Sequence, residues 1–131
     1  MVDGSFKNNN IKLSSIVEHD VSVFGFENEF SQVLLNILNN AKEIIIERKI
    51  AEGWVSVRIA EENARPVVCI SDNGGGIQKG LEEKIFEPYF TSRAMGTGLG
   101  LYMAKTIVET SMEGRLTVKN TDAGASFEII L

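Results

Sequence analysis

Two stretches of the chain carry apolar residues at the spacing of an amphipathic α-helix. The longer stretch predicts a helix over residues 27–51, with Gly53 just beyond its end. The shorter stretch predicts a second helix over residues 99–110, which Gly114 terminates. The apolar positions are Phe30, Val33, Leu34, Ile37, Leu38, Ala41, Ile44 and Ile45 in the first helix, and Leu101, Ala104, Ile107 and Val108 in the second.

Alternating apolar and polar residues predict β-strands in most of the remaining chain. The run before Asp72 is apolar on both sides, so it is expected at the centre of the sheet. The first two strands form a hairpin-like unit that Gly25 ends, and the last two form a final pair. The predicted strands are residues 11–17, 21–24, 55–59, 67–72, 116–118 and 127–131.

The region from residue 74 to 98 is glycine-rich and irregular, with one helical turn expected near residues 81–86. An irregular region of this length within a compact domain is usually functional, and often a lid. Together the predicted elements favour an α+β fold. We expect a two-layer α/β sandwich with a mixed sheet of about five strands, packed on one face against about three helices.

Composition restricts the possible functions. The 131 residues suit one domain, expected over residues 10–131, with residues 1–9 as a linker end or cloning remnant. A net charge of −5 argues against nucleic acid as a main partner. The single cysteine, Cys69, lies in an apolar run and is expected to be buried and unreactive. Neither a signal peptide nor a membrane-span-length apolar stretch is apparent, so we expect a cytoplasmic domain without direct membrane contact.

The long predicted helix carries three asparagines, Asn36, Asn39 and Asn40, although asparagine is a poor helix former. Asn36 and Asn40 are one turn apart and therefore share a stripe of the helix. A carboxamide oxygen is a hard neutral ligand, suited to Mg²⁺ that is already held by phosphates and water. The alternative is an asparagine-rich surface helix with no ligand.

Asp72 ends the buried strand and is followed by a run of three glycines. A carboxylate at such a position requires hydrogen-bond donors, and the exocyclic amine of adenine is one that guanine lacks. Gly74 and Gly76 permit backbone angles and close approach that a Cβ atom would block. The alternative is a simple Asp-Asn-Gly turn, which forms without any ligand.

A second glycine loop, from Gly96 to Gly100, immediately precedes the second helix. Free N–H groups at a helix start form an anion site of the kind that phosphates use. The spacing matches neither a Walker A loop nor a dinucleotide fingerprint. Between the two glycine loops, Phe86 and Phe90 flank Pro88. They are either core aromatics that anchor a loop or part of a segment that closes over a nucleotide.

In this order the four segments resemble the N, G1, F and G2 boxes of the catalytic, ATP-binding domain of sensor histidine kinases, in the GHKL superfamily. The resemblance extends from about residue 10 to Leu131 and implies the Bergerat fold, with ATP and Mg²⁺ as cofactors. It implies that Asn40 ligates the metal and that Asn36, Asn40 and Arg93 are the catalytic residues. The residues that it implies for ATP binding are Asn40, Lys42, Asp72, Gly74, Gly76, Ile77, Phe90, Gly96, Thr97, Gly98, Leu99, Gly100, Leu101 and Ser126.

Several of these positions are less specific. Lys42 either contacts phosphate or is solvated, because the basic residue of the family often stands one place later, where this chain has Glu43. Arg93 is either a contact to the terminal phosphate or a surface arginine. Ser126 stands where the family commonly places a hydroxyl near adenine. Asn36 replaces the water-activating glutamate of the related ATPases, which favours holding ATP over rapid hydrolysis.

The resemblance also implies partners. Histidine kinases phosphorylate a histidine on a separate dimerisation domain, and the phosphoryl group then passes to a response regulator. The sole histidine, His19, lies at a strand turn rather than on a long helix, so transfer is expected in trans from a monomeric domain. The alternatives are an ATP-binding sensing or interaction module that transfers nothing, and an ATPase or serine kinase of the same superfamily.

Overall fold

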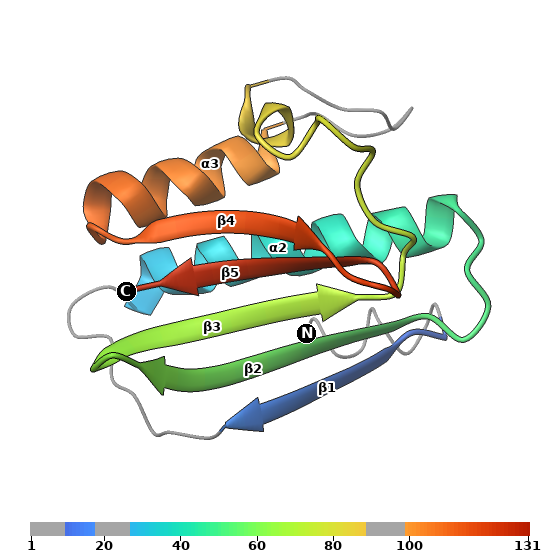
Figure 1. Cartoon of the computed structure of the whole chain (residues 1–131), viewed down its shortest axis with the longest axis horizontal. Coiled ribbons are helices and arrows are strands. Elements are labelled where there is room, and N and C mark those ends of the chain that lie inside the picture. Colours follow the sequence, from blue (N-terminus) through green and yellow to red (C-terminus); the bar gives the residue numbers. More distant parts are fainter. Residues whose placement is uncertain (1–9, 18–26, 89–98) are drawn as a thin grey trace.

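The computed structural model describes residues 10–17, 27–88 and 99–131. They form one sheet, whose curvature Figure 1 shows, and two α-helices. The elements in chain order are strand β1 (Lys12–Val17), helix α2 (Glu27–Glu47), strands β2 (Trp54–Glu62) and β3 (Arg65–Asp72), a 3-10 turn η1 (Lys84–Phe86), helix α3 (Gly100–Thr106), a π-helical turn η2 (Ile107–Ser111), and strands β4 (Arg115–Asn120) and β5 (Ala125–Ile130).

The sheet has five strands in the order β1-β2-β3-β5-β4. β1 runs parallel to β2, whereas the other neighbours are antiparallel, so the predicted mixed sheet is confirmed. β3 is the middle strand, as its apolar sequence predicts (Figure 1). β1 is an edge strand that pairs with β2 on one side, a pairing that the sequence did not predict. The predicted strand at residues 21–24 lies outside the described residues.

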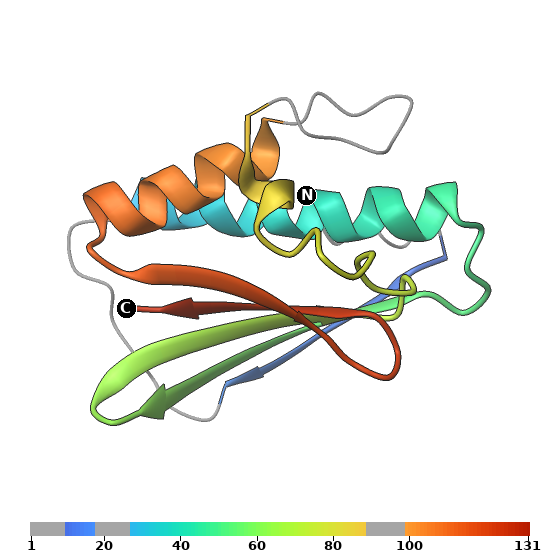
Figure 2. The same cartoon turned by 45° about the horizontal axis from the view of Figure 1, so that its top comes forward.

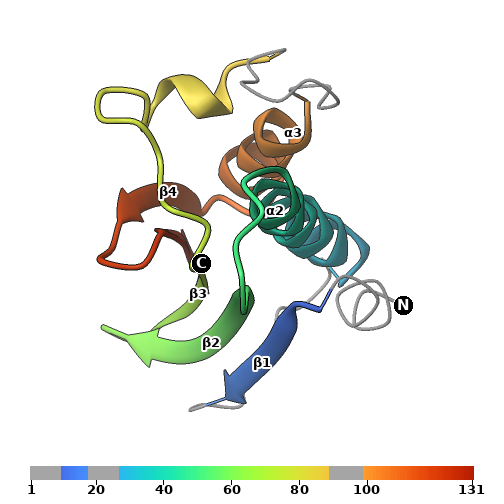
Figure 3. The same ribbon diagram turned by 90° about the vertical axis from the view of Figure 1, so that its right-hand side faces the viewer.

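Both helices lie on the same side of the sheet, as Figures 2 and 3 show. The two-layer α+β fold is therefore confirmed, with two helices and the short η1 turn among the described residues where about three helices were predicted. The core lies between the layers, where apolar side chains of α2 and α3 meet those of the sheet. Its fully buried side chains include Val33, Ile37, Val55, Val68, Ile70, Val108, Leu116, Phe127 and Ile129.

Helix α2 ends at Glu47, four residues before the predicted end at Ala51. The chain leaves the helix through Lys49, which has a φ of 53°. Its N–H donates to Ile46 O at 3.1 Å, and Ile50 N–H donates to Ile45 O at 3.1 Å. This is a Schellman motif with lysine in the position that glycine usually takes, so the glycine signal placed the helix end too late.

The sheet face opposite the helices carries Cys69, which is half-buried rather than fully buried as predicted. Burial, and next the charge of Glu128, raise the pKa of its thiol. The thiol is therefore protonated near neutral pH, which is consistent with an unreactive cysteine. Among the described residues, no helix combines the length and the apolarity that crossing a bilayer requires.

Candidate functional site

One stripe of α2 connects the separate motifs. Asn36, Asn40 and Ile44 succeed one another at one-turn intervals, so the stripe is about 12 Å long. At its first end, a Cβ atom added to Gly100, the first residue of α3, would lie 3.9 Å from Asn36 Cβ. At its other end, a Cβ atom added to Gly74 would lie 2.9 Å from Ile44 Cγ2. The start of α3 and the first glycine run therefore lie on either side of Asn40.

The two asparagines of this stripe are placed differently. Asn40 is a buried polar residue with 7 % of its surface exposed. Asn36 accepts a hydrogen bond at its Oδ1 from Gln32 Nε2 at 2.9 Å. Its Nδ2 atom is buried and has no hydrogen-bond partner in the described part of the chain. Because an unpaired buried donor is costly, this amide is suited to an acceptor that the described residues do not supply.

Asp72 is the most deeply buried carboxylate of the site, with 3 % of its surface exposed. Gly74 N–H donates to its Oδ1 at 2.9 Å. Burial raises the pKa of Asp72, while the N–H groups of Gly74 and Ala125 and the charge of Arg48 act in the opposite direction. A buried carboxylate has room for several donors, so a further donor from a ligand would be favourable.

Gly124, just before β5, permits the close approach of Asp72. A Cβ atom here would lie 2.7 Å from Asp72 Oδ1 and 2.9 Å from Gly74 N, and nearer still to the Asp72 carbonyl oxygen. Real Cβ atoms essentially never approach other atoms this closely. The last glycine of the chain is therefore part of the same cluster as the acid and the first glycine run.

Ser126 does not join this cluster through its hydroxyl. It pairs in register with Ser71, and the two hydroxyls are 3.0 Å apart. Since side chains alternate along a strand, Ser71 and Ser126 point to the sheet face opposite that of Asp72. The position predicted for an adenine-binding hydroxyl thus has the wrong orientation for direct contact with a base at Asp72.

Two residues that no sequence pattern selects, Arg48 and Asn120, hold the first glycine run. Arg48 Nη1 donates to the carbonyl oxygens of Gly74 and Gly76, at 2.6 and 2.9 Å. Asn120 binds both backbone groups of Ile77, at 2.7 and 2.8 Å. Both contacts join segments more than twenty residues apart in the sequence, and no local pattern predicts such pairs.

The other residues that the sequence predicts for ATP binding lie at different places relative to the α2 stripe. Lys42 is half-buried, but two residues along a helix correspond to a rotation of about 200°, so it does not share the stripe of Asn40. Leu99 and Leu101 flank Gly100 and are half-buried. Outside the described residues lie Phe90, Arg93, Gly96, Thr97 and Gly98, as well as His19.

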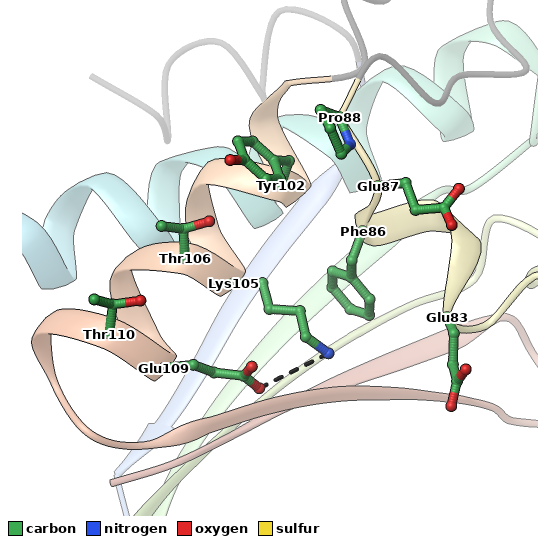
Figure 4. A pocket seen from close by; sticks show the side chains of 9 residues that line it. All are labelled: Glu83, Phe86, Glu87, Pro88, Tyr102, Lys105, Thr106, Glu109 and Thr110. Carbon is green, nitrogen blue, oxygen red and sulfur yellow. Dashed lines mark ion pairs between the residues drawn. The ribbon is translucent and has the colours of Figure 1, made fainter.

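Phe86 anchors the segment that precedes the second glycine loop. Its ring is buried and meets Phe127 edge-on, with centroids 6.2 Å apart. Lys105 Nζ lies 4.6 Å from the centre of the Phe86 ring and 3.8 Å from Glu109 Oε2. Beside these residues, between η1 and α3, is an open cavity of about 390 Å³ (Figure 4). Neither Asn40 nor Asp72 lines it, so it is separate from the candidate site.

The metal-ligating side chains of the candidate site can hold a metal ion only when a bound ligand supplies further ligating atoms. Within the described residues, no group of three or more histidine, cysteine or acidic side chains could hold a metal ion. Asn40 offers a single carboxamide oxygen. This chemistry suits Mg²⁺, which usually keeps several waters and binds proteins through few side chains together with substrate phosphates.

The raised pKa of Asp72 predicts a pH effect on stability. Between the ordinary pKa of aspartate and the raised value, the folded chain binds a proton that the unfolded chain has released. The loss of folding free energy that comes from burying ionised Asp72 is therefore fully present above the raised pKa. It disappears as the pH falls towards the ordinary pKa of aspartate. Lowering the pH should thus stabilise the wild type relative to Asp72→Asn. Urea unfolding of both proteins from neutral pH to about pH 4 measures this difference, and parallel pH profiles would contradict it.

The chain is similar to known proteins in both sequence and fold. The model of a family described as histidine kinase-, DNA gyrase B- and HSP90-like ATPase matches residues 25–131. Signal transduction histidine-protein kinase AtoS of Escherichia coli is 36 % identical over 120 residues, covering 89 % of this chain but 19 % of its own length. The chain therefore spans only about a fifth of that relative.

Solved structures show the same fold. The catalytic domain of histidine kinase ThkA, in a nucleotide-free form, has a TM-score of 0.82 at 28 % identity, covering 99 % of this chain and 88 % of its own. The mycobacterial sensor histidine kinase MprB has a TM-score of 0.81 at 27 % identity, covering 99 % and 90 %. These likenesses confirm the resemblance that the four sequence motifs indicate.

Proposed function

The chain belongs to the family of histidine kinase-, DNA gyrase B- and HSP90-like ATPases, as a catalytic domain of the histidine kinase type, and on this premise we propose that it binds Mg-ATP and donates the γ-phosphoryl group to a histidine of a separate dimerisation domain. The observation that carries the proposal is the buried Asp72 carboxylate, held by Gly74 N–H and closely approached by Gly124, beside the α2 stripe that bears Asn40.

Asp72 is the residue that recognises the adenine base. The carboxylate already accepts the Gly74 N–H at Oδ1 and interacts with the backbone N–H of Ala125, and a carboxylate accepts more hydrogen bonds than these. The exocyclic amine of adenine supplies a donor, whereas guanine presents a carbonyl oxygen at the corresponding place. A carbonyl oxygen facing a buried carboxylate would be repelled and unpaired, so the site discriminates between the two purines.

Asn40 orients the metal. The buried carboxamide oxygen of Asn40, in the middle of the stripe, would be one ligand of Mg²⁺, which when bound would neutralise charge on the phosphates. The N–H groups at the start of α3, next to Asn36, face the phosphate end of the nucleotide in this proposal. Arg93 supplies further positive charge to the terminal phosphate.

Asn36 favours transfer over hydrolysis. A carboxamide cannot remove a proton from water, and its Oδ1 already accepts a hydrogen bond from Gln32. The buried Nδ2 donor is suited to a phosphate oxygen instead. Catalysis in this site is therefore positioning and charge stabilisation, without a base from this helix position.

The phosphoacceptor domain docks at the start of α3. Tyr102 and Met103 are large side chains on its first turn, and they are 39 % and 45 % exposed. They adjoin Gly100 and hence the phosphate end of the stripe. An acceptor helix lying on them would bring its histidine to the γ-phosphoryl group, after which a response regulator in the cytoplasm receives it.

The test is transfer in trans. The chain, the phosphoacceptor domain of its parent kinase and ATP labelled at the γ-phosphate should together give an acid-labile, base-stable phosphohistidine on the acceptor. Label that stays in ATP would favour a sensing module that transfers nothing. Release of free phosphate without acceptor labelling would favour an ATPase, and base-labile phosphoserine a serine kinase.

Asn40→Ala tests the metal role. We expect the Mg²⁺-dependent part of ATP affinity to fall about 10- to 100-fold, as it does for other residues that shape metal sites. Asn39→Ala is the matched control, because Asn39 is the exposed neighbour on the same helix. Calorimetric titration with ATP, with Mg²⁺ and with a chelator, measures the effect. An equal Mg²⁺ dependence in both variants would remove Asn40 from the metal site.

A further inference from the structure

Arg48 reaches across the molecule to the first glycine run. It is the residue after the last one of α2, and its guanidinium meets a loop 26 residues further along the chain. One nitrogen, Nη1, donates to Gly74 O at 2.6 Å and to Gly76 O at 2.9 Å. The two bonds turn both carbonyl groups towards the same cation.

The segment that Arg48 holds is one that would otherwise sample many conformations. Gly75 and Gly76 have φ angles of 95° and 83°, which side chains rarely adopt. Glycine loses more conformational freedom on ordering than any other residue. Fixing this segment before a ligand arrives removes the conformational entropy cost of ordering it from binding.

Asn120 holds the other end of the same segment, and Gly74 links the segment to Asp72. Asn120 Oδ1 accepts from Ile77 N at 2.7 Å, and its Nδ2 donates to Ile77 O at 2.8 Å. Gly74 carries two of the contacts at once, because its N–H donates to Asp72 while its carbonyl accepts from Arg48. A shift of Gly74 would therefore disturb the carboxylate itself.

Arg48 also acts on Asp72 through its charge, which opposes the effect of burial on the pKa of that carboxyl. The residue as a whole is exposed and lies outside the hydrophobic core. Replacing it should leave the fold intact, so its effect on the loop can be separated from unfolding.

We propose that Arg48 is a positioning residue for adenine recognition, which holds the Gly74–Gly76 backbone in the shape that presents Asp72 to the base. This inference rests on the proposed ATP site. It assigns to Arg48 no contact with the nucleotide.

The experiment compares Arg48→Met, which cannot donate, with Arg48→Lys, which keeps a charge and a donor. Arg115→Met, at an exposed position of β4, controls for the loss of one positive charge. Calorimetric titration with Mg-ATP and Mg-GTP, and hydrogen exchange of the Gly74 amide in the nucleotide-free chain, are measured for each. We expect Arg48→Met to weaken ATP about tenfold, to reduce the preference for ATP over GTP, and to speed exchange at Gly74.

Arg48→Lys should recover part of each effect, and Arg115→Met should match the wild type. A variant Arg48→Met that keeps wild-type ATP preference and wild-type exchange at Gly74 would overturn the positioning role, while the ATP site stands. Faster exchange with unchanged purine preference would also overturn it, because the loop would then be loosened without consequence for the base. A wild-type chain that binds no ATP would overturn both the site and this inference.

Discussion

Asp72→Asn should weaken ATP binding by about 2–3 kcal/mol, or roughly 30- to 150-fold, and should abolish the preference for ATP over GTP. The physical reason is the replacement of an acceptor by a donor. An asparagine keeps one oxygen for Gly74 N–H, but its NH₂ group then faces either the Ala125 N–H or the adenine amine. Two donors facing each other in a buried site leave at least one of them unpaired. Calorimetric titration with both nucleotides measures the loss.

Ser71→Ala is the control for this substitution. Ser71 is the preceding residue of β3, and its hydroxyl pairs with that of Ser126 on the opposite sheet face. The control should bind ATP as the wild type does, while thermal unfolding checks that both variants are folded. If Asp72→Asn bound ATP and GTP with wild-type affinities, base recognition would have to lie elsewhere.

Gly124→Ala should destabilise the fold by about 1–3 kcal/mol, the usual cost of forcing an extra methyl group into a packed site. The new Cβ atom would lie 2.7 Å from Asp72 Oδ1 and 2.9 Å from Gly74 N, and both are held in place by their mutual hydrogen bond. Backbone atoms cannot move aside as the end of a flexible side chain can. The acid and the glycine run must therefore shift together, and ATP affinity should fall even where the variant is folded.

Gly100→Ala is the matched control for stability. The nearest atom to its added Cβ would be Asn36 Cβ at 3.9 Å, which is an ordinary contact. Because alanine is the better helix former, this variant should unfold at the same urea concentration as the wild type or a higher one. Equal unfolding free energies for Gly124→Ala and the wild type would show that the close approach of Asp72 and Gly74 does not require glycine at position 124.

Local patterns were sufficient for most of the fold. The three- and four-residue spacing of apolar positions predicts α2 because one face of that helix is buried, and the apolar run of β3 predicts a central strand. Patterns of this kind do not specify partners. β1 is recognisable as a strand, but its parallel pairing with β2 depends on the position of the intervening helix. Likewise, Lys49 ends α2 with a positive φ angle, which nothing in a lysine side chain predicts.

The same difference between local patterns and contacts of distant residues holds for the candidate site. Asp72 was identifiable because it ends a strand whose apolar pattern predicts burial, and Asn40 because asparagine is a poor helix former; both side chains are buried. Ser126 was predicted from motif position alone. The alternation that places Phe127 and Ile129 in the core already puts Ser126 on the other face. Arg48 and Asn120 act through backbone groups of distant residues, which carry no trace in the local sequence.

The most direct test of a single nucleotide site formed by Asn40 and Asp72 is calorimetric titration of the wild-type chain with ATP and with GTP, each in Mg²⁺ and in chelator. The predicted result is saturable binding of one ATP per chain, stronger with Mg²⁺ than without it, and a clear preference over GTP. Absence of saturable ATP binding, or equal affinities for the two purine nucleotides, would contradict it.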